Sequence, residues 1–186
     1  MQVGNETEDG GMATDTPAVS AADSRVRRPP TADERTTLVA FLGWHRETLR
    51  VKCAGLTPTQ LADRVLSPSG LSLLGLVRHA AETERFWFRT VMAGEPFEGL
   101  YAGDGAFDVA RADERTADEA WAAWRREVEF GERFVDEARD LDVAGDEPGE
   151  GPVSLRWVLM HLLEEYARHN GHADLLRERI DGVVGL

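Results

Sequence analysis

The C-terminal part of the chain carries one apolar stripe at helical spacing, and three polar residues interrupt it. Successive members lie three or four residues apart, which turns them toward one face of a helix: Leu155, Val158, Leu162, Glu165, His169, His172 and Leu176. A carboxylate and two imidazoles on a buried face are unfavourable unless each finds a partner. The stripe therefore predicts a long helix packed against a neighbour, with a polar site in the contact.

The residues in and opposite this stripe favour a metal site. Glu165 and His169 are four residues apart, so their side chains reach one point above a single helical turn. His79 lies in a second apolar stretch, on the same helical face as Leu76 and Phe86. Facing helices in a core bring such groups within ligand distance, and three ligands leave a position open for water or substrate. We predict a metal site of these three residues; a buried Glu–His pair without metal is the alternative.

Helical periodicity divides the rest of the chain into long amphipathic segments. We expect helices from about residue 31, over 71–92, from 116 and over 154–180, with a short helix over 57–65. Boxes of Thr-x-x-Glu at residues 31–34 and 116–119 predict two of the starts. Strand alternation is absent, and residues 142–152 are interpreted as a loop. These features predict an all-α fold, a four-helix bundle with a long crossover connection.

Composition limits the function and the location. The net charge of -13 disfavours nucleic acid and anionic membranes as partners. No apolar run is long enough to span a bilayer. Residues 1–30 are rich in Gly, Asp and Thr and lack the apolar core of a secretory signal, which predicts a disordered tail before a domain of residues 31–186 and a cytoplasmic location. The single cysteine, Cys53, is predicted to be a small buried side chain.

The other histidines and the tryptophans receive simpler interpretations. His161 borders the stripe and is predicted to be a hydrogen-bonded or surface residue. His45 points inward from the first helix and is predicted to be a core residue, with a place in a pocket as the alternative; Tyr166 is a second pocket candidate. The tryptophans occur at helical spacing, which predicts core packing: Trp44, Trp87, Trp121, Trp124 and Trp157.

The C-terminal residues also resemble a known family. They read Glu164-Glu165-Tyr-Ala-Arg-His169-Asn-Gly-His172-Ala-Asp-Leu-Leu-Arg-Glu178, similar to the EEYARHxGHADLLRE signature of a small uncharacterised branch of the DinB-like superfamily. The resemblance extends from about residue 31 to the C-terminus. It implies a four-helix bundle that holds a divalent metal with three residues, usually histidines, one from the second helix and two from an HxxxH on the last. The matching positions are His79, Glu165 and His169. His172 could displace Glu165, act as a fourth ligand or support the site from outside.

Related branches imply a thiol chemistry. The Glu in place of the first helical His resembles the mycothiol-dependent maleylpyruvate isomerases, and the bacillithiol transferases share the bundle and the metal. The resemblance implies a metal-dependent thiol transferase or isomerase, with Zn²⁺ or Ni²⁺, a low-molecular-weight thiol such as mycothiol, and a homodimer as a possible assembly. Substrate is expected to enter over residues 97–112. The alternative is a non-catalytic, metal-stabilised bundle that binds a ligand or a partner.

Overall fold

The computed structural model describes residues 25–101, 105–109 and 111–184, so residues 1–24 of the predicted disordered tail lie outside the described residues. Most of the described chain is helical. The long elements are α1 (Glu34–Cys53), α3 (Leu73–Arg85) with its π-helical continuation η1 (Phe86–Met92), α4 (Glu114–Glu137) and α5 (Leu155–Asp181). Smaller elements are α2 (Pro58–Ala62) and the strands β1 (Ala144–Glu147) and β2 (Gly151–Ser154). The prediction of a mainly helical protein is confirmed.

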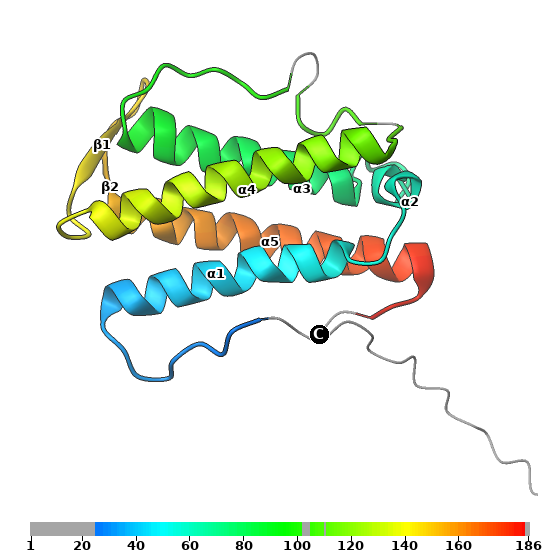
Figure 1. Cartoon of the computed structure of the whole chain (residues 1–186), viewed down its shortest axis with the longest axis horizontal. Coiled ribbons are helices and arrows are strands. Elements are labelled where there is room, and N and C mark those ends of the chain that lie inside the picture. Colours follow the sequence, from blue (N-terminus) through cyan, green and yellow to red (C-terminus); the bar gives the residue numbers. More distant parts are fainter. Residues whose placement is uncertain (1–24, 102–104, 110, 185–186) are drawn as a thin grey trace, which may run out of the picture.

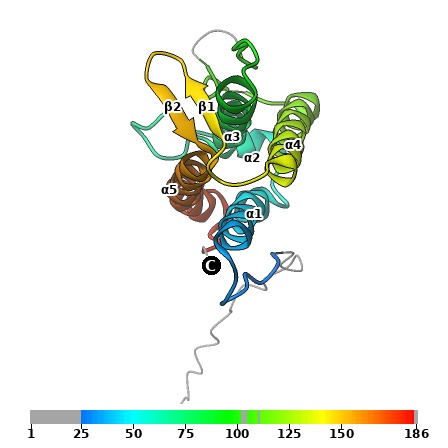
Figure 2. The ribbon, with the colours of Figure 1, turned by 90° about the vertical axis from the view of Figure 1, so that its left-hand side faces the viewer.

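The long helices lie side by side. α1 packs along α5, and α3 packs against both α4 and α5 (Figures 1 and 2). α3 and α4 run in the same direction, so the connection between residues 93 and 113 returns along the length of the helices (Figure 1). No helix among the described residues has both the length and the apolar character required to cross a membrane.

Two helices begin at aspartates and not at the predicted threonine boxes. Asp33 accepts a hydrogen bond from the backbone N–H of Thr36 at 3.0 Å, and Asp113 accepts one from Thr116 at 2.8 Å. Both caps occur in the same sequence, Asp-Glu-Arg-Thr, and each threonine hydroxyl also contacts its aspartate. The aspartate therefore serves as the N-cap, because its carboxylate satisfies both donors of the threonine. The predicted cap at Ser154 is confirmed.

The loop predicted over residues 142–152 contains a β-hairpin, which corrects the sequence interpretation. β1 and β2 pair antiparallel, with Ala144 opposite Ser154. The strands are short, and two glycines and a proline remove the alternation that identifies longer strands. Gly145 allows β1 to lie against η1, because a Cβ at this position would be 2.3 Å from the carbonyl oxygen of Val91.

A polar network crosses the apolar core. Arg46 donates two hydrogen bonds to the carboxylate of Glu84, each of 2.7 Å. The hydroxyl of Tyr166 donates to Glu84 at 2.8 Å, and the indole N–H of Trp124 donates to that hydroxyl at 2.8 Å. These residues come from α1, α3, α5 and α4 in turn. One connected network therefore joins all four long helices around Glu84, whose surface is fully buried.

Burial and charge fix the protonation states in this network. Burial alone would lower the pKa of Arg46, but the charge and hydrogen bonds of Glu84, with a smaller contribution from Glu132, together outweigh it and raise that pKa above its ordinary value. Burial, followed by the charge of Glu84, raises the pKa of Tyr166 well above its ordinary value. Tyr166 therefore keeps its proton and acts as a donor to Glu84.

Candidate metal centre

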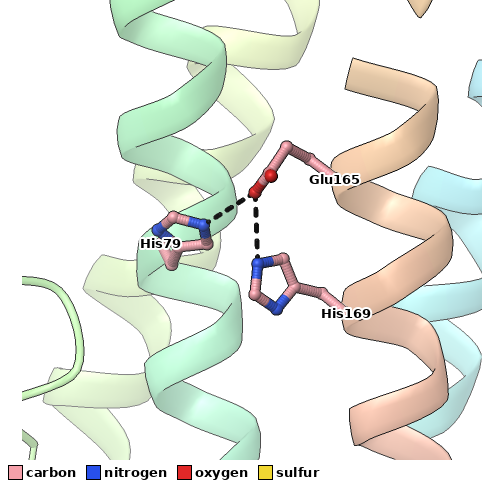
Figure 3. A group of neighbouring side chains, drawn as sticks. All are labelled: His79, Glu165 and His169. Atoms are coloured by element: carbon pink, nitrogen blue, oxygen red, sulfur yellow. Dashed lines mark hydrogen bonds and ion pairs between the residues drawn. The ribbon is translucent and has the colours of Figure 1, made fainter. Parts of the chain in front are cut away.

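Three side chains converge between α3 and α5 (Figure 3). His79 extends from α3, and Glu165 and His169 extend from neighbouring turns of α5. The Nε2 atoms of His79 and His169 lie 3.3 Å and 3.2 Å from the same carboxylate oxygen, Oε2 of Glu165. The three potential ligand atoms all lie within 4.8 Å of one another. The structure thus brings together the three residues that the sequence selected first.

The two separations measured from Oε2 of Glu165 fit a small divalent cation. Ligand bonds of about 2.0–2.1 Å in a tetrahedral site correspond to ligand–ligand separations of about 3.3 Å, which is close to the separations from Glu165 Oε2. The side chains of Glu165 and His169 are only 15% and 16% exposed, so the cation would be largely shielded from solvent. Two imidazoles and one carboxylate form a donor set that Zn²⁺ and Ni²⁺ accept.

The protonation states also fit a cation. Burial, followed by the neighbouring His79, lowers the pKa of His169 to about 4, so this imidazole is neutral at neutral pH. Burial alone would raise the pKa of Glu165, but the hydrogen bond with His79 and the charge of Arg168 outweigh it, and that pKa is lowered. Metal ligands must be deprotonated. Glu165 and His169 already meet this condition without a metal.

Two neighbours orient the cluster from outside. Arg168 donates to Oε1 of Glu165, which leaves Oε2 directed at the two imidazoles. The Nδ1 atom of His172 lies 3.3 Å from Nδ1 of His169, on the side of that ring opposite Glu165. His172 therefore contacts a predicted ligand but is not among the three converging atoms. Arg168 was not selected from the sequence, although its position three residues after Glu165 would place it on a neighbouring helical position.

The cluster borders two cavities. A cleft of about 580 Å³ is lined by the three cluster residues, by four aromatic side chains and by Glu82, Thr83, His161 and Arg168. A much smaller cavity of about 10 Å³ is lined by the cluster and by Leu49 and Tyr166, among others; this is room for about one water molecule. The pocket role proposed for Tyr166 thus applies to the inner cavity. The cluster lies between an open cleft and a small inner void.

The structure corrects the core prediction for Trp157 and adds His161 and Phe107 to the residues around the cluster. His161 lines the cleft and stacks on Trp157, with ring centroids 5.0 Å apart and planes 6° from parallel. Trp157 is 45% exposed and is therefore not a core residue. Phe107 stacks on His79 with a centroid distance of 4.9 Å; it comes from a loop without periodicity, so no local sequence signal could have identified it.

The structure also shows the surroundings of His45 and Cys53, which the sequence predicted to be core residues. His45 lines neither of the two cavities within the described part of the chain, and its backbone carbonyl accepts a hydrogen bond from the side chain of Asn170 at 3.0 Å. Cys53 is buried, as predicted, and burial raises the pKa of its thiol to about 12. A thiol with this pKa is not a nucleophile at neutral pH.

The lowered pKa of His169 predicts a pH dependence of stability in the metal-free protein. In the unfolded chain this histidine takes up a proton near its ordinary pKa of 6.5, but in the folded protein it resists protonation until about pH 4. The neutral form of His169 therefore makes its full contribution to the free energy of unfolding above pH 6.5, and this contribution is lost as the pH falls toward 4. We expect the difference in free energy of unfolding between the wild type and His169→Gln, measured by urea denaturation, to change across this window. A difference that stays constant from about pH 7 to about pH 4 would contradict the prediction.

Comparisons with known proteins agree with the fold. The sequence model of a family described as mycothiol-S-transferase matches residues 37–182. No curated protein matches the chain. The crystal structure of a conserved protein from Enterococcus faecalis is similar in fold, with a TM-score of 0.57 and 17% sequence identity over 82% of this chain and 100% of that one. The resemblance to DinB-like proteins is thereby confirmed, and the chain belongs to the mycothiol S-transferase family.

Proposed function

We propose that the protein is a metal-dependent S-transferase that joins a low-molecular-weight thiol of the mycothiol type to an electrophilic acceptor. The observation that carries this proposal is the convergence of His79, Glu165 and His169 in the lining of a cleft of about 580 Å³. The family description favours transfer over isomerisation as the reaction. A cleft of this volume is of the size that small-molecule ligands occupy.

Each residue of the site would have a distinct role. A divalent cation such as Zn²⁺ or Ni²⁺ in this site would lower the pKa of a thiol and so supply a thiolate at neutral pH. His79, Glu165 and His169 would hold the cation, and Arg168 would keep the carboxylate of Glu165 in place. His172 would orient the ring of His169 from outside, as such partners do for metal-bound histidines.

The architecture supports this assignment. We interpret the four long helices as a DinB-type four-helix bundle in which the segment between residues 93 and 113 is the long crossover. This segment carries Phe97 and Phe107, which line the cleft. The described parts of this segment, around Phe97 and Phe107, would therefore form the entrance for substrates, as expected for a long connection beside a site.

The proposal can be tested by removing the metal from the protein with a chelator and then adding it back. Protein purified without an affinity tag is expected to contain one divalent ion per chain by elemental analysis. Chelation should abolish thiol-dependent transfer from mycothiol or bacillithiol to an electrophile such as iodoacetamide, after correction for the spontaneous reaction, and Zn²⁺ or Ni²⁺ should restore it. A metal-free protein of unchanged stability would contradict the metal site. If the protein binds the thiols but catalyses no transfer with any added metal ion, the result would favour the non-catalytic alternative.

A further inference from the structure

We infer that the aromatic wall of the cleft is the acceptor subsite and that it selects a planar aromatic electrophile. The aromatic wall consists of Phe86, Trp87, Phe97 and Phe107. This inference rests on the proposed transferase function and names the class of its second substrate. Three rings would act as specificity-determining residues, because they touch the acceptor and take no part in bond making: the exposed Phe97 and the half-buried Phe86 and Phe107. Trp87 is buried and supports Phe86 through a ring contact.

The wall begins at the metal site and continues along the cleft. Phe107 stacks on His79 at 4.9 Å, so one ring lies directly against a candidate ligand. Farther along, the ring of Phe86 meets Phe97 at 5.7 Å and Trp87 at 5.1 Å, each pair at 80°. Edge-to-face pairs are favourable arrangements of aromatic rings. Phe97 is 55% exposed, so its ring is available for a flat guest to cover.

The local helix geometry explains why two consecutive residues, Phe86 and Trp87, both belong to the aromatic wall. Phe86 and Trp87 are the first residues of η1, where the backbone N–H of Ala93 bonds to the carbonyl of Phe88, five residues earlier. The wider π-helical turn changes the direction of successive side chains, and π-helical turns are frequent at functional sites. As a result both Phe86 and Trp87 line the cleft.

Two polar side chains of the cleft, Glu82 and Thr83, already have hydrogen-bonding partners. Glu82 accepts hydrogen bonds from the backbone N–H groups of Leu100 and Tyr101, at 2.7 Å and 3.0 Å. The hydroxyl of Thr83 donates to the carbonyl of His79 at 2.9 Å. A polyhydroxylated guest requires several hydrogen-bonding partners along its length, and this stretch of the cleft offers mainly rings. We therefore assign the stretch to the acceptor and not to a carbohydrate.

The reaction that this placement supports is a nucleophilic substitution on the aromatic ring. The sulfur of the thiolate attacks a ring carbon that bears a leaving group such as chloride. A C–S bond forms, the C–Cl bond breaks, and chloride leaves with the electron pair. The proton of the thiol has already gone to solvent. No oxidant or reductant is consumed.

Phe97 is the best position for the test, because it is 55% exposed and its replacement should leave the core intact. Metal-free protein is titrated calorimetrically with 1,3-dinitrobenzene, which is planar and lacks a leaving group. We expect saturable binding whose dissociation constant rises about 2- to 10-fold in Phe97→Ala. Phe97→Trp should retain the affinity. The matched control is Phe41→Ala on α1, an exposed phenylalanine outside the cleft lining, which should not change it.

Turnover gives an independent measurement on the metal-loaded protein. With mycothiol as donor, the ratio of kcat/KM for 1-chloro-2,4-dinitrobenzene over iodoacetamide should fall by a similar factor in Phe97→Ala. Turnover of iodoacetamide without this preference would overturn the acceptor subsite and leave the transferase function intact. Absence of turnover with either electrophile would overturn the function itself. Binding of inositol, a cyclic polyol, that is lost in Phe97→Ala would assign the wall to a carbohydrate and overturn the inference.

Discussion

Replacement of Glu84 with alanine is expected to lower the free energy of unfolding by about 3–5 kcal/mol, a large part of the stability of a domain of this size. The carboxylate is fully buried and accepts two hydrogen bonds from Arg46 and one from Tyr166. Its removal leaves the buried guanidinium of Arg46 with only the exposed Glu132, 3.6 Å away, as a charged partner. A buried charge that loses its hydrogen-bonded partner is among the most costly defects in a protein. Urea denaturation monitored by circular dichroism measures the effect.

A second pair of variants separates the unpaired charge from lost packing. Arg46→Met combined with Glu84→Leu removes both charges and refills the space, so most of the stability should return. Tyr166→Phe removes the hydrogen bond to the same carboxylate and also the acceptor of the buried Trp124 indole N–H, so it should cost about 1–3 kcal/mol. A Glu84→Ala protein as stable as the wild type would show that the network does not hold the four helices together.

The long helices were predictable because each has an apolar face several turns long. The C-terminal stripe predicted a helix over residues 154–180, and α5 covers Leu155–Asp181. Helix starts were less predictable, since Asp33 and Asp113 compete with nearby threonines for the same N-cap. η1 and the β-hairpin had no signal in the sequence. Both depend on tertiary contacts, such as the close approach of Gly145 to Val91, and not on local preference.

The two cluster residues that share one helix were predictable from the sequence. The residue that comes from a different helix was less predictable. Glu165 and His169 follow from helical spacing alone, and His79 required the assumption that two apolar faces meet. The network of Arg46, Glu84 and Tyr166 was not predicted. Charged residues appear solvated in a sequence pattern, and only the packed structure shows that Arg46 on α1 faces Glu84 on α3.

Removal of single ligands from the candidate metal centre is expected to have the largest effect on the proposed activity. His79→Ala and His169→Ala should each weaken Zn²⁺ binding more than about 100-fold, because the loss of a direct ligand exceeds the roughly 10- to 100-fold typical of outer partners. Glu165→Gln should have a comparable effect, since it removes the anionic ligand while its shape is kept. Competition with a chromophoric chelator near neutral pH measures the affinities, and thiol transfer should fall in parallel.

The comparison of Glu165 with His172 decides which of them completes the site. His172 contacts His169 at 3.3 Å and lies outside the three converging atoms, so His172→Ala should weaken binding by about 10- to 100-fold, less than Glu165→Gln. His45→Ala is the matched control, because this histidine lines neither cavity in the described structure and should leave the affinity unchanged. If His172→Ala has the greater effect, His172 is the direct ligand. In that case α5 would have to rearrange when the metal binds, since Glu165 now occupies the position between the two imidazoles.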